Sequence, residues 1–345
     1  MTEKRMSIFK MNLILKDGSS LNPTRAVFYP TYRCNLHCSM CYQNRHNRFV
    51  SELSLRDIKK IFIDSGIKQI HLVGGEIFIR KDIYDILQFF NSTMDYITIQ
   101  TNGTLISGEG VGVINEMDSI KEMWFSLDGL RDSHDLIRGH GAFDKTVKVI
   151  KSFIGSKCVV INSVIMKNNI NDMPKLYELA DSMGVDKIVF QFEMKYDKEA
   201  LKRTSTKLET LGIAGSMNDD CVQDEPNFEY IGELKKIIEE LRAKENKTKI
   251  NFLPEVFESD LDAYIEGTIF NGKCVACRDI LNSVVKIDPE GRLMICEALQ
   301  TNFDSVLYKS IECQWNDEEV RAIRQKLIGN NLLDLCSRCC CLEVI

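Results

Sequence analysis

The sequence lacks a long apolar run and a secretion signal. No stretch of the chain approaches the ~18 to 20 consecutive apolar residues that a membrane-spanning helix needs. The basic Lys4 and Arg5 near the start are followed by polar residues, without the apolar segment and cleavage site of a signal peptide. We therefore expect no membrane partner and a cytoplasmic location.

An excess of positive charge is also missing. The 44 Lys and Arg are outnumbered by 50 Asp and Glu, which gives a formal net charge of -6. Such a chain has no overall field that would attract a phosphate backbone, so we expect no nucleic-acid partner. With 345 residues and 44% hydrophobic side chains, it can fill one barrel-sized domain and a smaller accessory domain.

Cysteine, by contrast, is abundant, with 13 in the chain. In a reducing compartment this number argues for metal ligation and against a disulfide framework. The cysteines are unevenly placed, because only Cys158 and Cys221 lie between position 41 and position 274. We expect two separate metal-binding regions, one near each end of the chain.

Short β-branched or aromatic runs alternate with amphipathic helical patterns from position 26 to position 192, which is typical of repeated βα units. The predicted strands are 26–30, 68–73, 96–100, 122–126, 159–164 and 187–192. The predicted helices between them are 54–65, 81–92, 143–153 and 172–183. Six units are too few for a closed eight-stranded barrel. The expected fold class is therefore α/β, a partial (β/α)6 TIM-like barrel with a small C-terminal cysteine-rich domain.

The first predicted strand leads directly into Cys34, Cys38 and Cys41, at C-x3-C-x2-C spacing. A closed structural zinc site needs four protein ligands. An iron–sulfur cluster held by three cysteines leaves one iron open to a small molecule. The triplet therefore favours a cluster with an open iron, at the carboxyl end of a strand, where parallel barrels form their active sites.

Residues suited to ligand binding follow the next three predicted strands as well. Paired glycines let a ligand approach the backbone closely, and a carboxylate can accept hydrogen bonds from a cation. Each of these segments, taken singly, also fits a simple turn or a surface ion pair. Their occurrence in order at consecutive strand ends is not explained by turns and ion pairs alone. The candidates are Gly74, Gly75, Glu76, Thr101, Asn102, Ser126, Asp128 and Arg138.

With these residues together, the sequence resembles the radical S-adenosylmethionine (SAM) superfamily. The resemblance implies that Cys34, Cys38 and Cys41 hold a [4Fe–4S] cluster whose open iron binds SAM. The family often has an aromatic residue beside the third cysteine, and Tyr42 matches. It also implies an electron donor such as a flavodoxin or ferredoxin.

The resemblance assigns SAM contacts to the strand ends. The Gly-Gly-Glu segment 74–76 is implied to bind the methionine amino group, and Ser126 and its polar neighbours the ribose or carboxylate. Arg138 is implied as a partner of the SAM carboxylate. Ile77 stands where the family often has proline, a difference that leaves these contacts unchanged.

The carboxyl-terminal cysteines form a second pattern. Cys277, Gly291 and Cys296 fit C-x13-G-x4-C, in which a Pro-Glu-Gly turn folds a hairpin that brings both thiols together. The pattern resembles the twitch, the shortened form of the SPASM auxiliary-cluster domain, and implies one auxiliary [4Fe–4S] cluster. Its expected ligands are Cys277, Cys296, Cys336 and Cys339, with Cys274 as the main competitor and Cys340 and Cys341 as spares. Two C-x2-C pairs also fit zinc, although their separation exceeds the usual spacing.

Four segments follow from these patterns. They are a lead-in at 1–24, the radical SAM partial barrel at 25–195, a helical linker at 196–270 and the twitch or SPASM-like auxiliary cluster domain at 271–345.

The resemblance implies an enzyme in which SAM is cleaved reductively to a 5′-deoxyadenosyl radical that removes hydrogen from a substrate C–H bond. Because an auxiliary cluster most often serves oxidation, we expect an oxidoreductase. The short segment before the first strand and the single auxiliary cluster favour a small metabolite, such as a sugar, cyclitol or nucleotide. The alternatives are a maturase or epimerase of a ribosomally made peptide and, more remotely, a non-catalytic metal-binding scaffold. No general base is identified.

Overall fold

The structure is a computed structural model, which describes residues 18–41, 50–194, 196–217, 222–223, 230–255, 258–270, 275–301 and 303–344. Within these ranges, no helix is both long enough and apolar enough to cross a bilayer. Tyr42, Cys221 and Cys274 lie outside the described residues.

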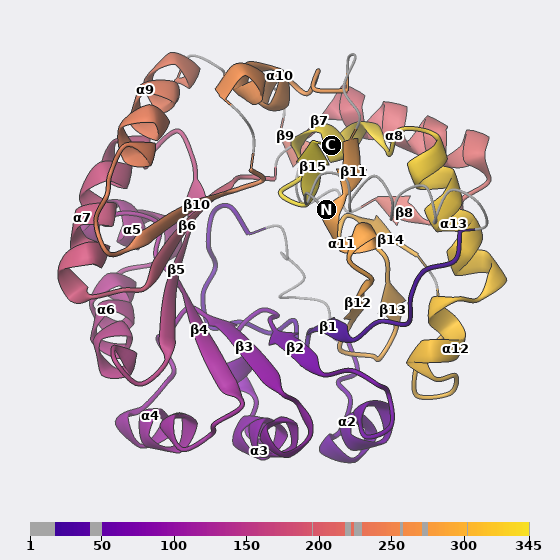
Figure 1. Ribbon diagram of the computed structural model, residues 1–345, viewed down its shortest axis with the longest axis horizontal. Coiled ribbons are helices and arrows are strands. Elements are labelled where there is room, and N and C mark those ends of the chain that lie inside the picture. Colours follow the sequence, from indigo (N-terminus) through magenta and orange to yellow (C-terminus); the bar gives the residue numbers. More distant parts are fainter. Residues whose placement is uncertain are drawn as a thin grey trace.

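A curved sheet of nine strands organises the chain (Figure 1). Its six central strands follow one another in sequence order and run parallel. The predicted fold class and the six predicted strands are confirmed, with strand ends displaced by at most two residues. The six strands are β1 (Arg25–Phe28), β2 (Gln69–Leu72), β3 (Tyr96–Thr101), β4 (Ile120–Ser126), β5 (Cys158–Ile165) and β6 (Lys187–Phe192).

Two further parallel strands extend this sheet, one at each side. β10 (Lys249–Leu253) pairs with β6, within the segment for which the sequence pattern predicts only helix. Polar residues occupy much of this edge strand, so its pattern lacks the continuous apolar run of a central parallel strand. At the other side β12 (Val284–Ile287) pairs with β1, and β13 (Leu293–Met294) follows as an antiparallel edge. The predicted cysteine hairpin is thus part of the barrel sheet.

Helices cover the outer, convex face of the sheet (Figure 1). Between the strands lie α2 (Leu55–Phe62), α3 (Ile83–Thr93), α4 (Gly108–Asn115), α5 (Arg131–Arg138), α6 (Ala142–Phe153), α7 (Met173–Met183) and α9 (Ile231–Arg242). The four predicted helices correspond to α2, α3, α6 and α7. The short helices η2 (Ile77–Ile79) and η3 (Ile170–Asp172) precede α3 and α7.

A group of short strands and helices extends from beside α9 over the top and the right of the view in Figure 1. Its helices are α8 (Lys198–Leu211), α10 (Leu261–Glu266), α11 (Arg278–Leu281), α12 (Ile311–Trp315), α13 (Glu318–Gly329), η5 (Glu258–Asp260) and η6 (Asp334–Arg338). Its strands are β7 (Tyr196–Asp197), β8 (Ser216–Met217), β9 (Val222–Gln223), β11 (Val275–Cys277), β14 (Leu299–Gln300) and β15 (Leu342–Val344). β11 and β15 pair, which ties the last cysteines to Cys277.

Local sequence signals explain where the helices begin and end. The Ser54 side chain accepts a hydrogen bond from the Asp57 N–H at 3.2 Å and caps α2. Helix α7 ends at Gly184, whose φ of 80° suits glycine. In the hairpin between β12 and β13, Gly291 has a φ of 78° and its N–H donates to the Asp288 carbonyl.

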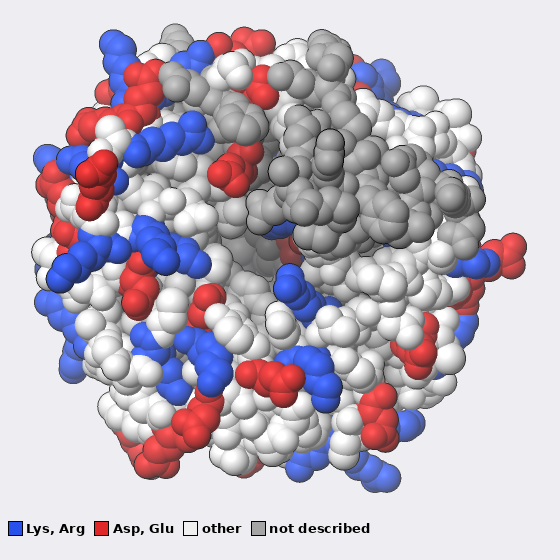
Figure 2. Space-filling model, viewed as in Figure 1, with Lys and Arg blue, Asp and Glu red and all other residues white. Residues whose placement is uncertain are grey.

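The strand side chains that face the helices form the main core. Phe28 of β1 packs against Phe62 of α2 and Phe90 of α3, with ring centroids 5.3 Å and 6.2 Å away. The alternate side chains of the strands face the interior of the barrel. On the outer surface shown in Figure 2, basic and acidic side chains are intermixed, in line with the small net charge.

Candidate active site

A cavity of ≈ 340 Å³ lies at the carboxyl ends of the parallel strands and connects the two cysteine-rich regions. Its wall contains side chains from β1 to β6, from β10 and from β12. The cysteines that line it are Cys34, Cys38, Cys41, Cys340 and Cys341. A cavity in this place is what a parallel barrel predicts for its active site.

The first three cysteines lie half-buried in the loop after β1. Cys41 donates its N–H to the Cys38 carbonyl at 3.1 Å, and Ser39 donates its N–H to the Ile137 carbonyl of α5 at 3.1 Å. Burial raises the pKa of the Cys34 thiol to about 11 and also raises that of Cys38. A bound metal would hold these cysteines as thiolates, and three half-buried thiols that face one cavity fit such a metal cluster.

Gly74 and Gly75 support the cysteine loop. A Cβ on Gly75 would lie 2.2 Å from the Arg33 carbonyl oxygen, and one on Gly74 would lie 2.4 Å from that of Thr31. The Gly75 N–H donates to the Thr31 carbonyl at 3.1 Å, and the Glu76 N–H donates to the Arg33 carbonyl at 2.8 Å. The glycines are therefore required by the backbone of the cysteine loop itself, in addition to lining the cavity.

Glu76 is only 1% exposed, and its carboxylate forms hydrogen bonds with other residues of the protein. Its carboxylate accepts from the Asn102 N–H at 2.8 Å and from the Thr101 hydroxyl, which is 2.9 Å from both oxygens. Burial raises the pKa of Glu76, and these hydrogen bonds oppose the shift. Here the carboxylate joins the ends of β2 and β3, while its contact with SAM stays a prediction.

Asn102 lies between this junction and the first cysteine. Its Nδ2 is 4.0 Å from the Cys34 sulfur and donates to Asn35 Oδ1 at 3.0 Å. Thr101 and Asn102 both line the cavity, as the sequence analysis predicts for cofactor-binding residues.

Arg138 links the fourth strand end to the second cysteine. Its Nε donates to the Asp128 carboxylate, and its Nη1 is 3.8 Å from the Cys38 sulfur. Although burial opposes it, the charges of Asp128 and Cys38 raise the pKa of Arg138. Asp128 is completely buried and also accepts from the Val164 N–H at 2.8 Å. Arg138 and Ser126 line the cavity, whereas Asp128 positions the arginine from behind.

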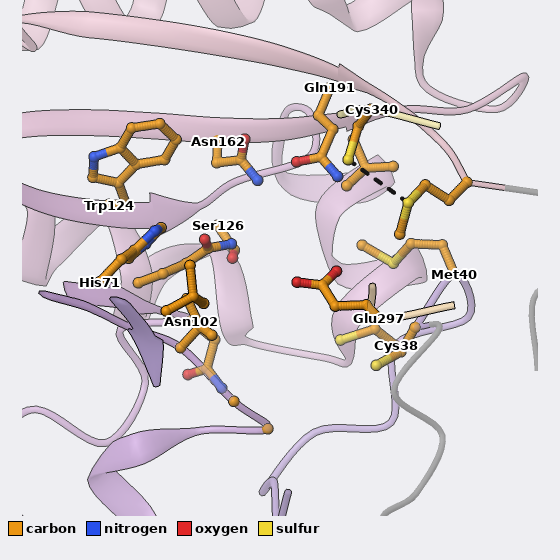
Figure 3. A pocket seen from close by; sticks show the side chains of 18 of the residues that line it. Cys38, Met40, His71, Asn102, Trp124, Ser126, Asn162, Gln191, Glu297 and Cys340 are labelled. Carbon is orange, nitrogen blue, oxygen red and sulfur yellow. Dashed lines mark hydrogen bonds between the residues drawn. The ribbon is translucent and has the colours of Figure 1, made fainter. Parts of the chain in front are cut away.

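Polar residues deeper in the barrel were missed by a reading confined to strand ends. They come from β2 to β6 and are His71, Gln100, Trp124, Asn162 and Gln191. Figure 3 labels His71, Trp124, Asn162 and Gln191 in the cavity wall. The His71 and Trp124 rings lie 5.8 Å apart. Burial lowers the pKa of His71 to about 4, so the imidazole is neutral at pH 7. His71 Nε2 and Asn162 Oδ1 are buried without a hydrogen-bond partner among the described residues. The sequence offered one signal for these residues: they occupy the alternate positions of their strands whose side chains face the interior of the barrel.

A smaller cavity of ≈ 40 Å³ lies beside the first and collects the carboxyl-terminal cysteines. The five that line it are Cys277, Cys296, Cys336, Cys339 and Cys341. The sulfurs of Cys339, Cys340 and Cys341 also lie within 4.8 Å of one another. The structure therefore brings the four predicted auxiliary ligands together and adds Cys341.

Charged side chains form the wall between the two cavities. The Lys286 amino group is 2.8 Å from the Asp279 carboxylate and 3.3 Å from that of Glu297, which also accepts from the Tyr29 hydroxyl. Burial raises the pKa of Asp279 to about 6, and the Cys341 thiolate adds to this shift. The buried Lys286 thus has two carboxylates as partners beside the carboxyl-terminal cysteines.

The fold and the site define a class: a partial parallel barrel with a cysteine triplet at the end of its first strand and a second cysteine group beside the same cavity. Residues 28–180 match the sequence model of the radical SAM superfamily. Over these residues, which are somewhat less than half of the chain, the protein is therefore similar to a radical SAM domain.

Relatives agree with this assignment. Over 170 residues the chain is 32% identical to Fe-coproporphyrin III synthase of Methanosarcina barkeri, covering 48% of this chain and 42% of that protein. It is 32% identical over 160 residues to the antilisterial bacteriocin subtilosin biosynthesis protein AlbA of Bacillus subtilis, covering 44% and 36%. Each match spans less than half of the relative. The fold resembles Streptococcus suis SuiB bound to S-adenosylmethionine, with a TM-score of 0.64, 18% identity and coverage of 97% and 75%.

Proposed function

We propose that this radical SAM enzyme modifies a peptide by removing hydrogen from a C–H bond. The observation that carries the proposal is the shared cavity, which has the cysteine triplet on one side and the carboxyl-terminal cysteines on the other. A substrate in that cavity would meet both cysteine groups. When bound at Cys34, Cys38 and Cys41, a [4Fe–4S] cluster would supply the electron that cleaves SAM.

The preference for a peptide corrects the lean toward a small metabolite that the sequence suggested. That expectation depended on the shortness of the segment before the first strand and on the single auxiliary cluster, and neither describes the cavity. SuiB is also known in a complex with its precursor peptide SuiA, and AlbA is named for the biosynthesis of a bacteriocin. Likeness to these proteins supports the peptide alternative more than the metabolite.

The chemistry of the cavity also fits a peptide. Its deeper part presents the amide side chains of Gln100, Asn162 and Gln191 together with the neutral imidazole of His71. Amides both donate and accept hydrogen bonds, so they match peptide N–H and carbonyl groups. A charged group placed beside these neutral side chains would lose its hydration without gaining an opposite charge, which costs far more than the desolvation of a neutral group.

The chain's own residues would hold the SAM and its cluster as follows. Arg138 offers its guanidinium to a carboxylate, and Asp128 keeps that guanidinium oriented. Gly74 and Gly75 hold the cysteine loop against the end of β2. Four of the carboxyl-terminal cysteines would hold an auxiliary [4Fe–4S] cluster, since their thiols converge on one small cavity.

The first experiment tests the radical SAM site. Anaerobically reconstituted protein with SAM and dithionite should form 5′-deoxyadenosine, and the Cys34→Ala/Cys38→Ala/Cys41→Ala variant should form none. The variant should keep the far-UV circular dichroism of the parent, because these cysteines lie in a loop. 5′-Deoxyadenosine from the folded triple variant would disprove the assignment.

The second experiment tests the substrate class. Short peptides encoded beside the gene are incubated with the enzyme, SAM and reductant, and their masses are compared with untreated peptide. Loss of two hydrogens indicates oxidation, and one deuterium gained in D₂O without oxidation indicates epimerisation. No mass change in any such peptide would contradict a peptide maturase.

A small metabolite remains the second candidate, favoured by the similarity to Fe-coproporphyrin III synthase. It predicts that added metabolites, and not peptides, raise 5′-deoxyadenosine formation above its substrate-free rate. The same assay, run with a deuterated candidate, should transfer deuterium into 5′-deoxyadenosine only for a true substrate.

A further inference from the structure

Two ring side chains, Trp124 of β4 and His71 of β2, line the deep end of the larger cavity. Trp124 precedes Ser126 by two residues, and His71 precedes Gly74 by three. At about 3.3 Å per residue, both rings lie roughly 7 to 10 Å deeper in the barrel than those two positions. Figure 3 shows them at the opposite end of the view from Cys38. They therefore lie apart from the residues that we expect to hold the cluster and SAM.

The indole of Trp124 is held from outside the cavity. Its Nε1–H donates to the Glu122 carboxylate at 2.6 Å, and the Tyr96 hydroxyl donates to the same carboxylate at 2.9 Å. Neither Glu122 nor Tyr96 is among the described residues that line the cavity. The indole thus uses its only hydrogen-bond donor away from the cavity, which leaves ring carbon atoms to face it.

His71 adds a polar atom to the same surface. Its ring lies 5.8 Å from that of Trp124 at an interplanar angle of 52°, so the two rings form an angled aromatic wall. His71 Nε2 is buried without a hydrogen-bond partner among the described residues, and the low pKa keeps the imidazole neutral at pH 7. Val27, which pairs in register with His71, adds an aliphatic side chain. The wall is therefore apolar and aromatic, with one neutral hydrogen-bonding atom.

These features discriminate among the side chains that a substrate could place there. A cation would find the Glu122 carboxylate already engaged by two donors, and a carboxylate would meet the apolar ring face. An aliphatic or phenyl side chain would leave the buried His71 nitrogen unpaired. An aromatic ring with a hydroxyl or N–H group can pack against Trp124 and hydrogen bond with His71 at the same time.

We propose that Trp124 and His71 form a pocket for an aromatic side chain of the substrate peptide, one that carries a single hydroxyl or N–H group, such as tyrosine. Trp124 packs against the ring, and His71 hydrogen bonds with its polar group. Glu122 is a positioning residue that holds the indole in place. The inference rests on the proposed function, because it presupposes a peptide substrate.

The test measures binding by anaerobic isothermal titration calorimetry, with reconstituted protein, SAM and no reductant. The probes are four peptides, N-acetyl-Gly-X-Gly-N-methylamide, in which X is tyrosine, phenylalanine, leucine or lysine. The tyrosine peptide should bind about fivefold or more tightly than the phenylalanine peptide, because a phenyl ring leaves His71 unpaired. It should bind about tenfold or more tightly than the leucine and lysine peptides, which lack the ring.

Two variants separate the contributions of the two rings. His71→Leu should remove the difference between the tyrosine and phenylalanine peptides, since the hydrogen bond is lost. Trp124→Leu should weaken both aromatic peptides about fivefold or more. The matched control is Trp315→Phe, at the other tryptophan of the chain, which is not among the described residues that line the cavity. That control should keep all four affinities, and SAM should bind equally to every variant.

Other outcomes overturn the inference. Equal binding of the tyrosine, phenylalanine and leucine peptides would refute the aromatic pocket and leave the peptide substrate standing. Tightest binding of the lysine peptide would indicate a cation site at Trp124 instead. Equal weakening of SAM and peptide by Trp124→Leu would place the adenine of SAM against the indole. Should Trp124→Leu fail to fold, the parent and His71→Leu decide the question with the tyrosine and phenylalanine peptides. Binding of none of the four would contradict the peptide substrate of the proposed function itself.

Discussion

Gly75 shows how much a single position controls at this site. It carries no functional group, yet it decides whether the cysteine loop can lie against the end of β2. Because Gly75 has no Cβ, two backbone carbonyl oxygens can pack against it. A Cβ at this position would lie 2.2 Å from the Arg33 oxygen and 2.5 Å from the Tyr32 oxygen. Because both are backbone atoms, no side-chain rotation relieves the clash.

Gly75→Ala should therefore displace the cysteine loop and reduce SAM cleavage by about fivefold or more, as expected for a cost of about 1 to 3 kcal/mol. The matched control is Gly112→Ala in α4, where an added Cβ meets nothing within 4 Å. That variant should retain activity and gain about 1 kcal/mol of helix propensity. Iron content and 5′-deoxyadenosine formation are the measurements, and normal values for both in Gly75→Ala would contradict the assigned role.

Two histidines, the buried His134 and the half-buried His71, should make the fold sensitive to acid. Burial lowers the pKa of both His71 and His134 to about 4, from 6.5. Below about pH 6.5 the unfolded chain binds protons that the folded chain excludes, so stability falls until the pH reaches about 4. Each histidine can contribute up to about 3 kcal/mol to this loss.

Urea unfolding of the cluster-free protein at several pH values measures this effect. The control is His71→Leu, which removes one of the two titrating groups. The pH dependence of the unfolding free energy between pH 6.5 and 4.5 should become shallower by about 1 kcal/mol per pH unit. An unchanged dependence would show that His71 takes up its proton in the folded state.

At the scale of elements, α5 is held to the end of β4 by the ion pair between Arg138, which lines the cavity, and the buried Asp128 behind it. Asp128 follows β4 and is completely buried, and Arg138 is the last residue of α5. The same helix carries a second arginine pair at its start, between Arg131 and Asp144, with more than half of each side chain exposed. The two pairs differ in solvation and therefore in the energy that each contributes.

Arg138→Met should destabilise the protein by about 3 to 5 kcal/mol, because it leaves the Asp128 charge buried without its partner. Arg131→Met on the same helix should change stability by no more than about 1 kcal/mol, since exposed pairs contribute little. Chemical denaturation of the two variants makes the comparison. Equal losses would mean that Asp128 is neutralised some other way.

At the scale of the whole molecule, the carboxyl-terminal region completes the barrel sheet. β12 pairs with β1 in register, so that Val285 lies opposite Ala26 and Lys286 opposite Val27. The same strand brings Lys286 to the wall between the two cavities. Removing this region would uncover a strand of the main sheet as well as one side of the active site.

A chain ending at residue 270 should therefore associate through the exposed edge of β1 and not behave as an independent barrel. Size-exclusion chromatography of the truncated and full-length proteins at equal concentration tests this expectation. A monomeric truncated protein with a cooperative thermal transition would show that the barrel is complete without β12.

The sequence by itself determined the elements whose signal is local. Six strands followed from apolar runs bounded by turns, and the cysteine triplet followed from spacing alone. Gly291 marked the hairpin because its backbone conformation suits glycine. The resemblance to the radical SAM superfamily also needed no tertiary information, since the residues that carry it occur in a fixed order along consecutive strand ends.

Tertiary structure decided the features that depend on contacts between distant residues. β10 is an edge strand with polar side chains, and only its pairing with β6 makes it a strand. The carboxylates of Glu76 and Asp128 accept hydrogen bonds from backbone N–H groups of neighbouring strands, those of Asn102 and Val164, and are buried there. Cys341 reached the boundary of two cavities because β15 pairs with β11, a placement that spacing along the chain does not encode.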